Sequence, residues 1–149
     1  MAQAQKNNAF QPCYLFFYGS LMDPDILQNI ARLENPPVLQ DASIEGYKMK
    51  MWGGTYPTLL AIQAGENDPG KVTGKAWKAT TLDQIRNLEY YETSAYKITE
   101  CKIQLNGNEI VDGMTFCWSG VNGDDELQEG SFDLEEYRKS TKPIMFGFR

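Results

Sequence analysis

The sequence contains no histidine and only three cysteines among its 149 residues. Without histidine, the chain cannot build a Ser-His-Asp or Cys-His triad of its own, nor a zinc site with histidine ligands. Proton transfer would therefore depend on a carboxylate, a lysine, a tyrosine or a cysteine. Cys13, Cys101 and Cys117 show no CxxC spacing, and their odd number is typical of reduced, buried thiols in a cytoplasmic protein.

Basic clusters and long apolar segments are also missing. The chain has 14 Lys and Arg against 20 Asp and Glu, so we expect neither nucleic acid nor a membrane as a partner. The longest apolar run, residues 14–18, is far shorter than the roughly 20 residues of a membrane helix. The polar residues 1–12 lack the apolar segment of a secretory signal and are expected to be a disordered leader. Residues 13–149 are then expected to form a single cytoplasmic domain, with no particular oligomeric state indicated.

Short apolar runs separated by glycine or proline predict that strands make up most of the chain. Residues 14–18 form a continuous apolar run that ends at Gly19, which is typical of a strand buried on both faces. Asn106 and Gly107 separate two such runs, and this pair is the strongest short signal for a hairpin. The other predicted strands span residues 38–44, 48–52, 58–62, 72–78, 96–105 and 110–118.

Three helices are predicted among these strands. In the second of them, Leu82, Ile85 and Leu88 recur at helical spacing and should form the buried stripe. Because most strands are linked without a helix between them, the order favours an α+β fold with a mixed, partly closed sheet. Residues 119–130 are predicted to be a polar loop, and residues 144–148 an aromatic tail that packs back onto the body. The predicted N-caps are Asp23, Thr81 (with Gln84 completing a capping box) and Asp133, and the helices span residues 24–33, 81–92 and 134–140.

The first candidate functional segment is Tyr18-Gly19-Ser20-Leu21. It lies where a buried strand ends and a helical segment follows, and such turns leave backbone N–H groups free to bind a carboxylate or an oxyanion. Gly19 would let the backbone turn and a ligand approach closely. The simpler alternative is an ordinary turn with Tyr18 as a core aromatic residue.

The second candidate segment is the end of the predicted helix 81–92. Glu92 follows Leu88 by four residues and therefore shares its inward face, whereas Glu89 falls beside the buried stripe. A carboxylate among aromatic rings loses hydration, which raises its pKa and makes it a plausible acid and base near neutral pH. The alternative is a solvated glutamate at a helix end. The aromatic residues expected nearby are Tyr90, Tyr91 and Tyr96, with Trp52 and Tyr56 as further members of an aromatic pocket.

Together these segments resemble the gamma-glutamylcyclotransferase-like superfamily, which includes the plant avirulence-induced-gene proteins and gamma-glutamylamine cyclotransferase. The matching motifs follow in the family's order over about residues 13–118. Two positions depart from the family pattern: Glu89 stands where Asp is common, and Thr93-Ser94 replaces a Gly that often follows the glutamate. The motifs are Leu15-Phe16-Phe17-Tyr18-Gly19-Ser20-Leu21, then Gly46 and Tyr56-Pro57-Thr58-Leu59, then Val72-Thr73-Gly74, and finally Leu88-Glu89-Tyr90-Tyr91-Glu92 with Tyr96.

The resemblance implies a small mixed β-barrel, closed or nearly closed, with flanking helices. It also implies that Glu92 is the catalytic residue, and that no metal or other cofactor takes part. The expected activity is release of 5-oxoproline and a free amine from a small-molecule substrate, a γ-glutamyl amide or amine. Two alternatives stay open: proton transfer, cyclisation or isomerisation of another small metabolite by Glu92, and a binding module without catalysis. The substrate-binding residues implied are Tyr18, Gly19, Ser20 and Leu21, whose backbone amides would hold the glutamyl group, with Tyr56 and Tyr96.

Overall fold

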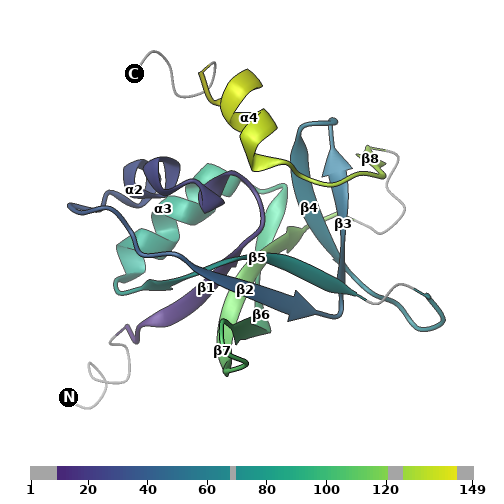
Figure 1. Cartoon of the computed structure of the whole chain (residues 1–149), viewed down its shortest axis with the longest axis horizontal. Coiled ribbons are helices and arrows are strands. Elements are labelled where there is room, and N and C mark those ends of the chain that lie inside the picture. The colour runs from purple at the N-terminus through teal and green to yellow at the C-terminus, as the bar shows by residue number, and fades with distance from the viewer. Residues whose placement is uncertain (1–9, 68–69, 121–125, 144–149) are drawn as a thin grey trace.

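The computed structural model describes residues 10–67, 70–120 and 126–143, which form a barrel, a smaller sheet and flanking helices (Figure 1). In these three ranges, no helix has the length and apolar character needed to cross a membrane. In chain order the elements are β1 (Cys13–Phe17), the 3-10 helix η1 (Ser20–Met22), α2 (Pro24–Ala31), β2 (Gln40–Glu45), β3 (Tyr47–Trp52), β4 (Tyr56–Ala61), β5 (Lys71–Ala79), α3 (Leu82–Glu92), β6 (Tyr96–Leu105), β7 (Ile110–Trp118), β8 (Leu127–Gln128) and α4 (Leu134–Ser140).

Five strands close into a barrel in the order β1-β5-β2-β6-β7. Most neighbours are antiparallel, and the barrel closes where β1 pairs in parallel with β7. The strands β4-β3-β8 form a separate sheet, which Figure 1 shows beside the barrel on the side away from α2 and α3. The expected α+β fold with a closed mixed barrel is therefore confirmed.

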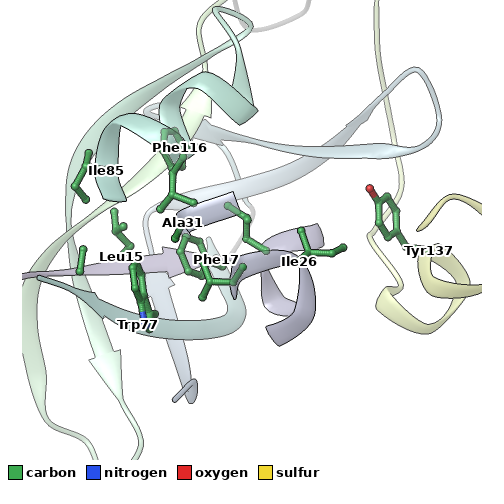
Figure 2. Close-up of a cluster of buried hydrophobic side chains, with 12 residues drawn as sticks. Leu15, Phe17, Ile26, Ala31, Trp77, Ile85, Phe116 and Tyr137 are labelled. Carbon is green, nitrogen blue, oxygen red and sulfur yellow. The ribbon is translucent and has the colours of Figure 1, made fainter. Parts of the chain in front are cut away.

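Strand β1 is buried on both faces, as its continuous apolar run predicts. Leu15 and Phe17 face a core shared with the helices, and Phe16 faces the barrel interior. Figure 2 shows the first core, with Trp77 of β5 and Ile85 of α3 beside these side chains. Because successive side chains of a strand point to opposite faces, β1 packs into both cores, and this packing fixes the position of its end.

A glycine in the Val-Thr-Gly motif lets the barrel close tightly. A Cβ atom at Gly74 would lie only 2.1 Å from the carbonyl oxygen of Phe17 on the neighbouring strand. No other residue fits there without moving the backbone, so this motif serves the fold of the barrel.

Asp23 links two helices at the end of η1. It caps α2 as predicted, with its carboxylate accepting hydrogen bonds from the backbone N–H groups of the first turn. The same buried carboxylate binds Arg138 at 2.9 Å and Lys142 at 2.8 Å, so α4 is tied to the start of α2. Burial of Asp23 opposes its ionisation, but the hydrogen bonds from Lys142 and Arg138 outweigh this effect and lower its pKa.

Two predicted elements were too long. The strand predicted at residues 38–44 begins two residues later, because pairing with β5 starts there and Val38 is 85% exposed. The helix predicted at residues 24–33 ends at Ala31, because Arg32 takes a left-handed conformation with φ of 61°.

Two further predictions were wrong. Leu82 is 43% exposed and does not belong to the buried stripe of α3, because it lies at the first helical position, ahead of the part that packs on the core. Residues 119–130, predicted to be a loop, contain the short strand β8, which pairs with β3 through a buried Leu127. The predicted aromatic tail at residues 144–148 and most of the leader lie outside the described residues.

Candidate active site

A partly enclosed cavity of about 260 Å³ lies where the end of β1, the end of α3 and the β3–β4 hairpin meet. Its wall is mainly aromatic, and one side is closed by a residue of α4. Every predicted site residue except Tyr90 contributes to this wall. The lining residues are Phe16, Phe17, Tyr18, Gly19, Ser20, Leu21, Trp52, Tyr56, Pro57, Tyr91, Glu92, Thr93, Tyr96, Phe116 and Tyr137.

The packing of α3 aims Glu92 into the cavity. Ile85 and Leu88 are buried against the core, and Glu92 follows Leu88 by one helical turn. The helix ends immediately afterwards, because Thr93 has φ of 68°, a conformation that favours glycine. A glycine would adopt this conformation more easily, and Thr93 keeps it here.

The carboxyl group of Glu92 has unusual electrostatics. Burial raises its pKa from 4.5 to about 8, because the carboxylate loses hydration. Within the described part of the chain, no hydrogen bond or ion pair reaches this carboxylate. Among the described residues Glu92 therefore has no polar partner, and it faces a space that a small molecule can enter.

Tyrosine hydroxyls surround Glu92. The pKa values of Tyr18, Tyr91, Tyr96 and Tyr137 are all raised; burial is the largest cause, and the charge of ionised Glu92 adds to it. These phenols therefore stay neutral at physiological pH. Glu92 is then the one lining residue whose protonation changes near neutral pH.

Hydrogen bonds fix these hydroxyl groups in place. The Ser20 and Tyr91 hydroxyls lie 2.7 Å apart, and both lie near enough to the Tyr137 hydroxyl to lower its pKa against the larger effect of burial. Tyr18 donates to the carbonyl of Phe116 on β7. These interactions hold the polar side chains of the cavity wall in fixed positions on the barrel, α3 and α4.

The turn after β1 brings two sequence motifs into contact. A Cβ atom at Gly19 would lie 2.9 Å from Cγ of Pro57, so glycine allows the Tyr-Gly-Ser and Tyr-Pro segments to pack together. The 3-10 helix η1 begins at Ser20, and its first internal hydrogen bond comes from the N–H of Met22. Among the described residues, no hydrogen bond occupies the backbone N–H of Ser20 or Leu21.

The cavity unites the predicted site residues, with one error. Tyr90, predicted to lie near Glu92, is 89% exposed because it sits on the outward face of α3. Tyr137 was not identified from sequence, because its position depends on ion pairs between α4 and Asp23 that no local pattern indicates. The roles of the lining residues in binding and catalysis stay predictions. Those that line the cavity as predicted are Tyr18, Gly19, Ser20, Leu21, Trp52, Tyr56, Tyr91, Glu92 and Tyr96.

The described residues contain no cluster of side chains suited to binding a metal ion. Across residues 10–67, 70–120 and 126–143, no three His, Cys, Asp or Glu side chains come close enough together to hold a metal ion. Among the described residues that line the cavity, Glu92 is the single carboxylate, and none is a cysteine.

The closed mixed barrel of this chain matches the fold of solved gamma-glutamyl cyclotransferases. One solved gamma-glutamyl cyclotransferase matches with a TM-score of 0.56 at 17% identity, over 75% of this chain and 69% of that one. The chain belongs to the family described as gamma-glutamyl cyclotransferase, AIG2-like, whose model matches residues 15–137. AIG2-like protein C of Arabidopsis thaliana is 31% identical over 130 residues, which are 86% of this chain and 70% of that protein. The solution structure of another Arabidopsis thaliana protein matches with a TM-score of 0.65 at 27% identity, over 92% of this chain and 79% of that one.

Proposed function

We propose that the protein is a cyclotransferase that converts a γ-glutamyl amide into 5-oxoproline and a free amine. One observation carries this proposal: Glu92, with its raised pKa and no polar partner among the described residues, lies in a cavity beside the free N–H groups after β1. Membership of the gamma-glutamyl cyclotransferase, AIG2-like family supports the same reaction.

The glutamyl group binds through its two charges. The backbone N–H groups of Ser20 and Leu21 hold the α-carboxylate, as such groups bind anions at the start of helical segments. The α-ammonium pairs with ionised Glu92. This arrangement bends the glutamyl chain so that its amine lies near its own γ-carbonyl carbon, and this proximity supplies much of the rate acceleration.

The reaction moves two protons from the α-nitrogen to the leaving nitrogen. Glu92 accepts the first proton, and the neutral amine attacks the γ-carbonyl carbon to form the new C–N bond. Glu92 then passes its proton to the leaving nitrogen, and the old C–N bond breaks. The second proton follows by the same route, so the products are the lactam and an ammonium ion. A pKa of about 8 suits this work, because Glu92 must gain and lose a proton in each turnover.

The direct test is product analysis on a panel of L-γ-glutamyl compounds. The purified protein should release 5-oxoproline and the matching amine in equal amounts from at least one of them. Proton transfer on a different metabolite would instead change that metabolite without releasing 5-oxoproline. A binding module would bind a γ-glutamyl compound and leave it intact, and either result would contradict the proposal.

A further inference from the structure

Three aromatic rings form one side of the cavity on and beside the β3–β4 hairpin. The ring centre of Trp52 lies 6.3 Å from that of Tyr56 and 6.2 Å from that of Tyr96. The ring centre of Trp118 lies 5.2 Å from that of Trp52, so the two rings pack together. The hydroxyl of Tyr96 donates a hydrogen bond to the carbonyl of Pro57 at 2.9 Å. The rings therefore form a fixed apolar wall.

This wall reaches solvent at Tyr56, whereas the end of β1 forms the buried end of the cavity. Tyr56 is 37% exposed and Trp52 is partly exposed, whereas Leu21 and Tyr18 at the end of β1 are buried. If the glutamyl group occupies the buried end beside Glu92, the group on the leaving nitrogen must extend along the three rings toward the opening.

The wall itself offers little charge to a leaving group. Among the described lining residues, Glu92 is the one charged side chain, and the α-ammonium of the glutamyl group already uses it. Outside the lining, the exposed carboxylate of Glu126 accepts a hydrogen bond from the indole N–H of Trp52 at 3.2 Å. A carboxylate on the leaving amine would meet neither Lys nor Arg there. A second ammonium would find no second carboxylate among the described lining residues, and an exposed carboxylate such as Glu126 stabilises an ion pair only weakly. Burying either charge without a partner is unfavourable.

We infer that the preferred leaving amine is uncharged apart from its reacting nitrogen and carries an aromatic or other apolar group, which packs on Trp52, Tyr56 and Tyr96. This inference rests on the proposed cyclotransferase function and specifies its substrate class. Contact between aromatic rings adds affinity beyond simple burial. An aromatic ring on the leaving amine should therefore raise kcat/KM above that of a substrate without the ring.

Four matched substrates test the inference through 5-oxoproline release. L-γ-glutamyl benzylamide carries the ring alone, and L-γ-glutamyl methylamide lacks it. L-γ-glutamyl-L-phenylalanine adds a carboxylate to the ring compound, and the mono-γ-glutamyl amide of 4-(aminomethyl)benzylamine adds an ammonium. We expect kcat/KM for the benzylamide to exceed each of the other three by about tenfold or more.

Variants of the wall residues test whether the aromatic wall causes the preference for the benzylamide. Trp52→Ala should lower the ratio of benzylamide to methylamide kcat/KM by about fivefold, and Tyr56→Ala, at a more exposed site, provides the same test if the first variant is unstable. Tyr90→Ala removes an aromatic ring from the outward face of α3 and should leave the ratio unchanged.

The outcomes separate the two proposals. Release of 5-oxoproline without preference for the benzylamide, or with preference for a charged compound, overturns this inference and leaves the cyclotransferase function standing. An unchanged ratio in both wall variants also overturns it. Absence of 5-oxoproline from all four compounds overturns the cyclotransferase function, and this inference with it.

Discussion

Replacing Glu92 with glutamine is expected to lower kcat for 5-oxoproline release by about a thousandfold or more. Glutamine keeps the size of the side chain and fills the same part of the cavity, but it cannot accept a proton from the α-ammonium. Among the described lining residues there is no second carboxylate, and the raised pKa values of Tyr91 and Tyr96 keep these phenols from acting as the base, so we expect no replacement for the lost group. Release of 5-oxoproline, followed under saturating substrate, measures the effect.

Glu89→Gln is the matched control for this variant. Glu89 lies on the same helix but is exposed and outside the cavity wall, so its replacement should leave kcat unchanged. Circular dichroism of both variants should match that of the wild type. Wild-type turnover by the Glu92→Gln protein would remove Glu92 from the mechanism.

The same variant should be more stable than the wild type at alkaline pH. The pKa of Glu92 in the folded state, about 8, is above its ordinary value of 4.5, so the folded protein binds more protons than the unfolded chain between these values. The contribution of Glu92 to stability is therefore fully present below pH 4.5 and is lost as pH rises through 8. Glutamine removes this loss, so the free energy of unfolding should increase by on the order of 4 kcal/mol at about pH 8.

Urea denaturation across the pH range measures this gain. The difference between Glu92→Gln and wild type should be small near pH 4.5 and should grow with pH up to about 8. Glu89→Gln should differ from wild type by less than about 0.5 kcal/mol throughout, as expected of an exposed site. A pH-independent difference for Glu92→Gln would show that its carboxyl group is ordinarily hydrated. A stability gain joined to a loss of activity is typical of catalytic groups that the fold holds in an unfavourable environment.

Local patterns were enough to predict the elements that carry the site. The continuous apolar run of β1 predicted a strand buried on both faces, and the capping residues Asp23 and Thr81 marked the starts of two helices. The spacing from Leu88 to Glu92 predicted that the glutamate points inward, because residues four apart share a helix face. These inferences need only the geometry of one element at a time.

Contacts between distant segments were not predictable in this way. Tyr137 reaches the cavity because Arg138 and Lys142 bind the buried Asp23, and the residues that form these ion pairs are more than a hundred positions apart. Tyr90 was misplaced because a helix end with two adjacent tyrosines can direct only one of them inward. Strand β8 was missed because two residues are too few to show a period.

Product analysis in water enriched in oxygen-18 decides between cyclisation and hydrolysis. Attack by the substrate's own amine uses no water, so mass spectrometry should find 5-oxoproline without oxygen-18, in equal amount to the free amine. Glutamate carrying oxygen-18 would mean that water attacks the γ-carbonyl, and it would contradict the mechanism in which Glu92 activates the α-amine.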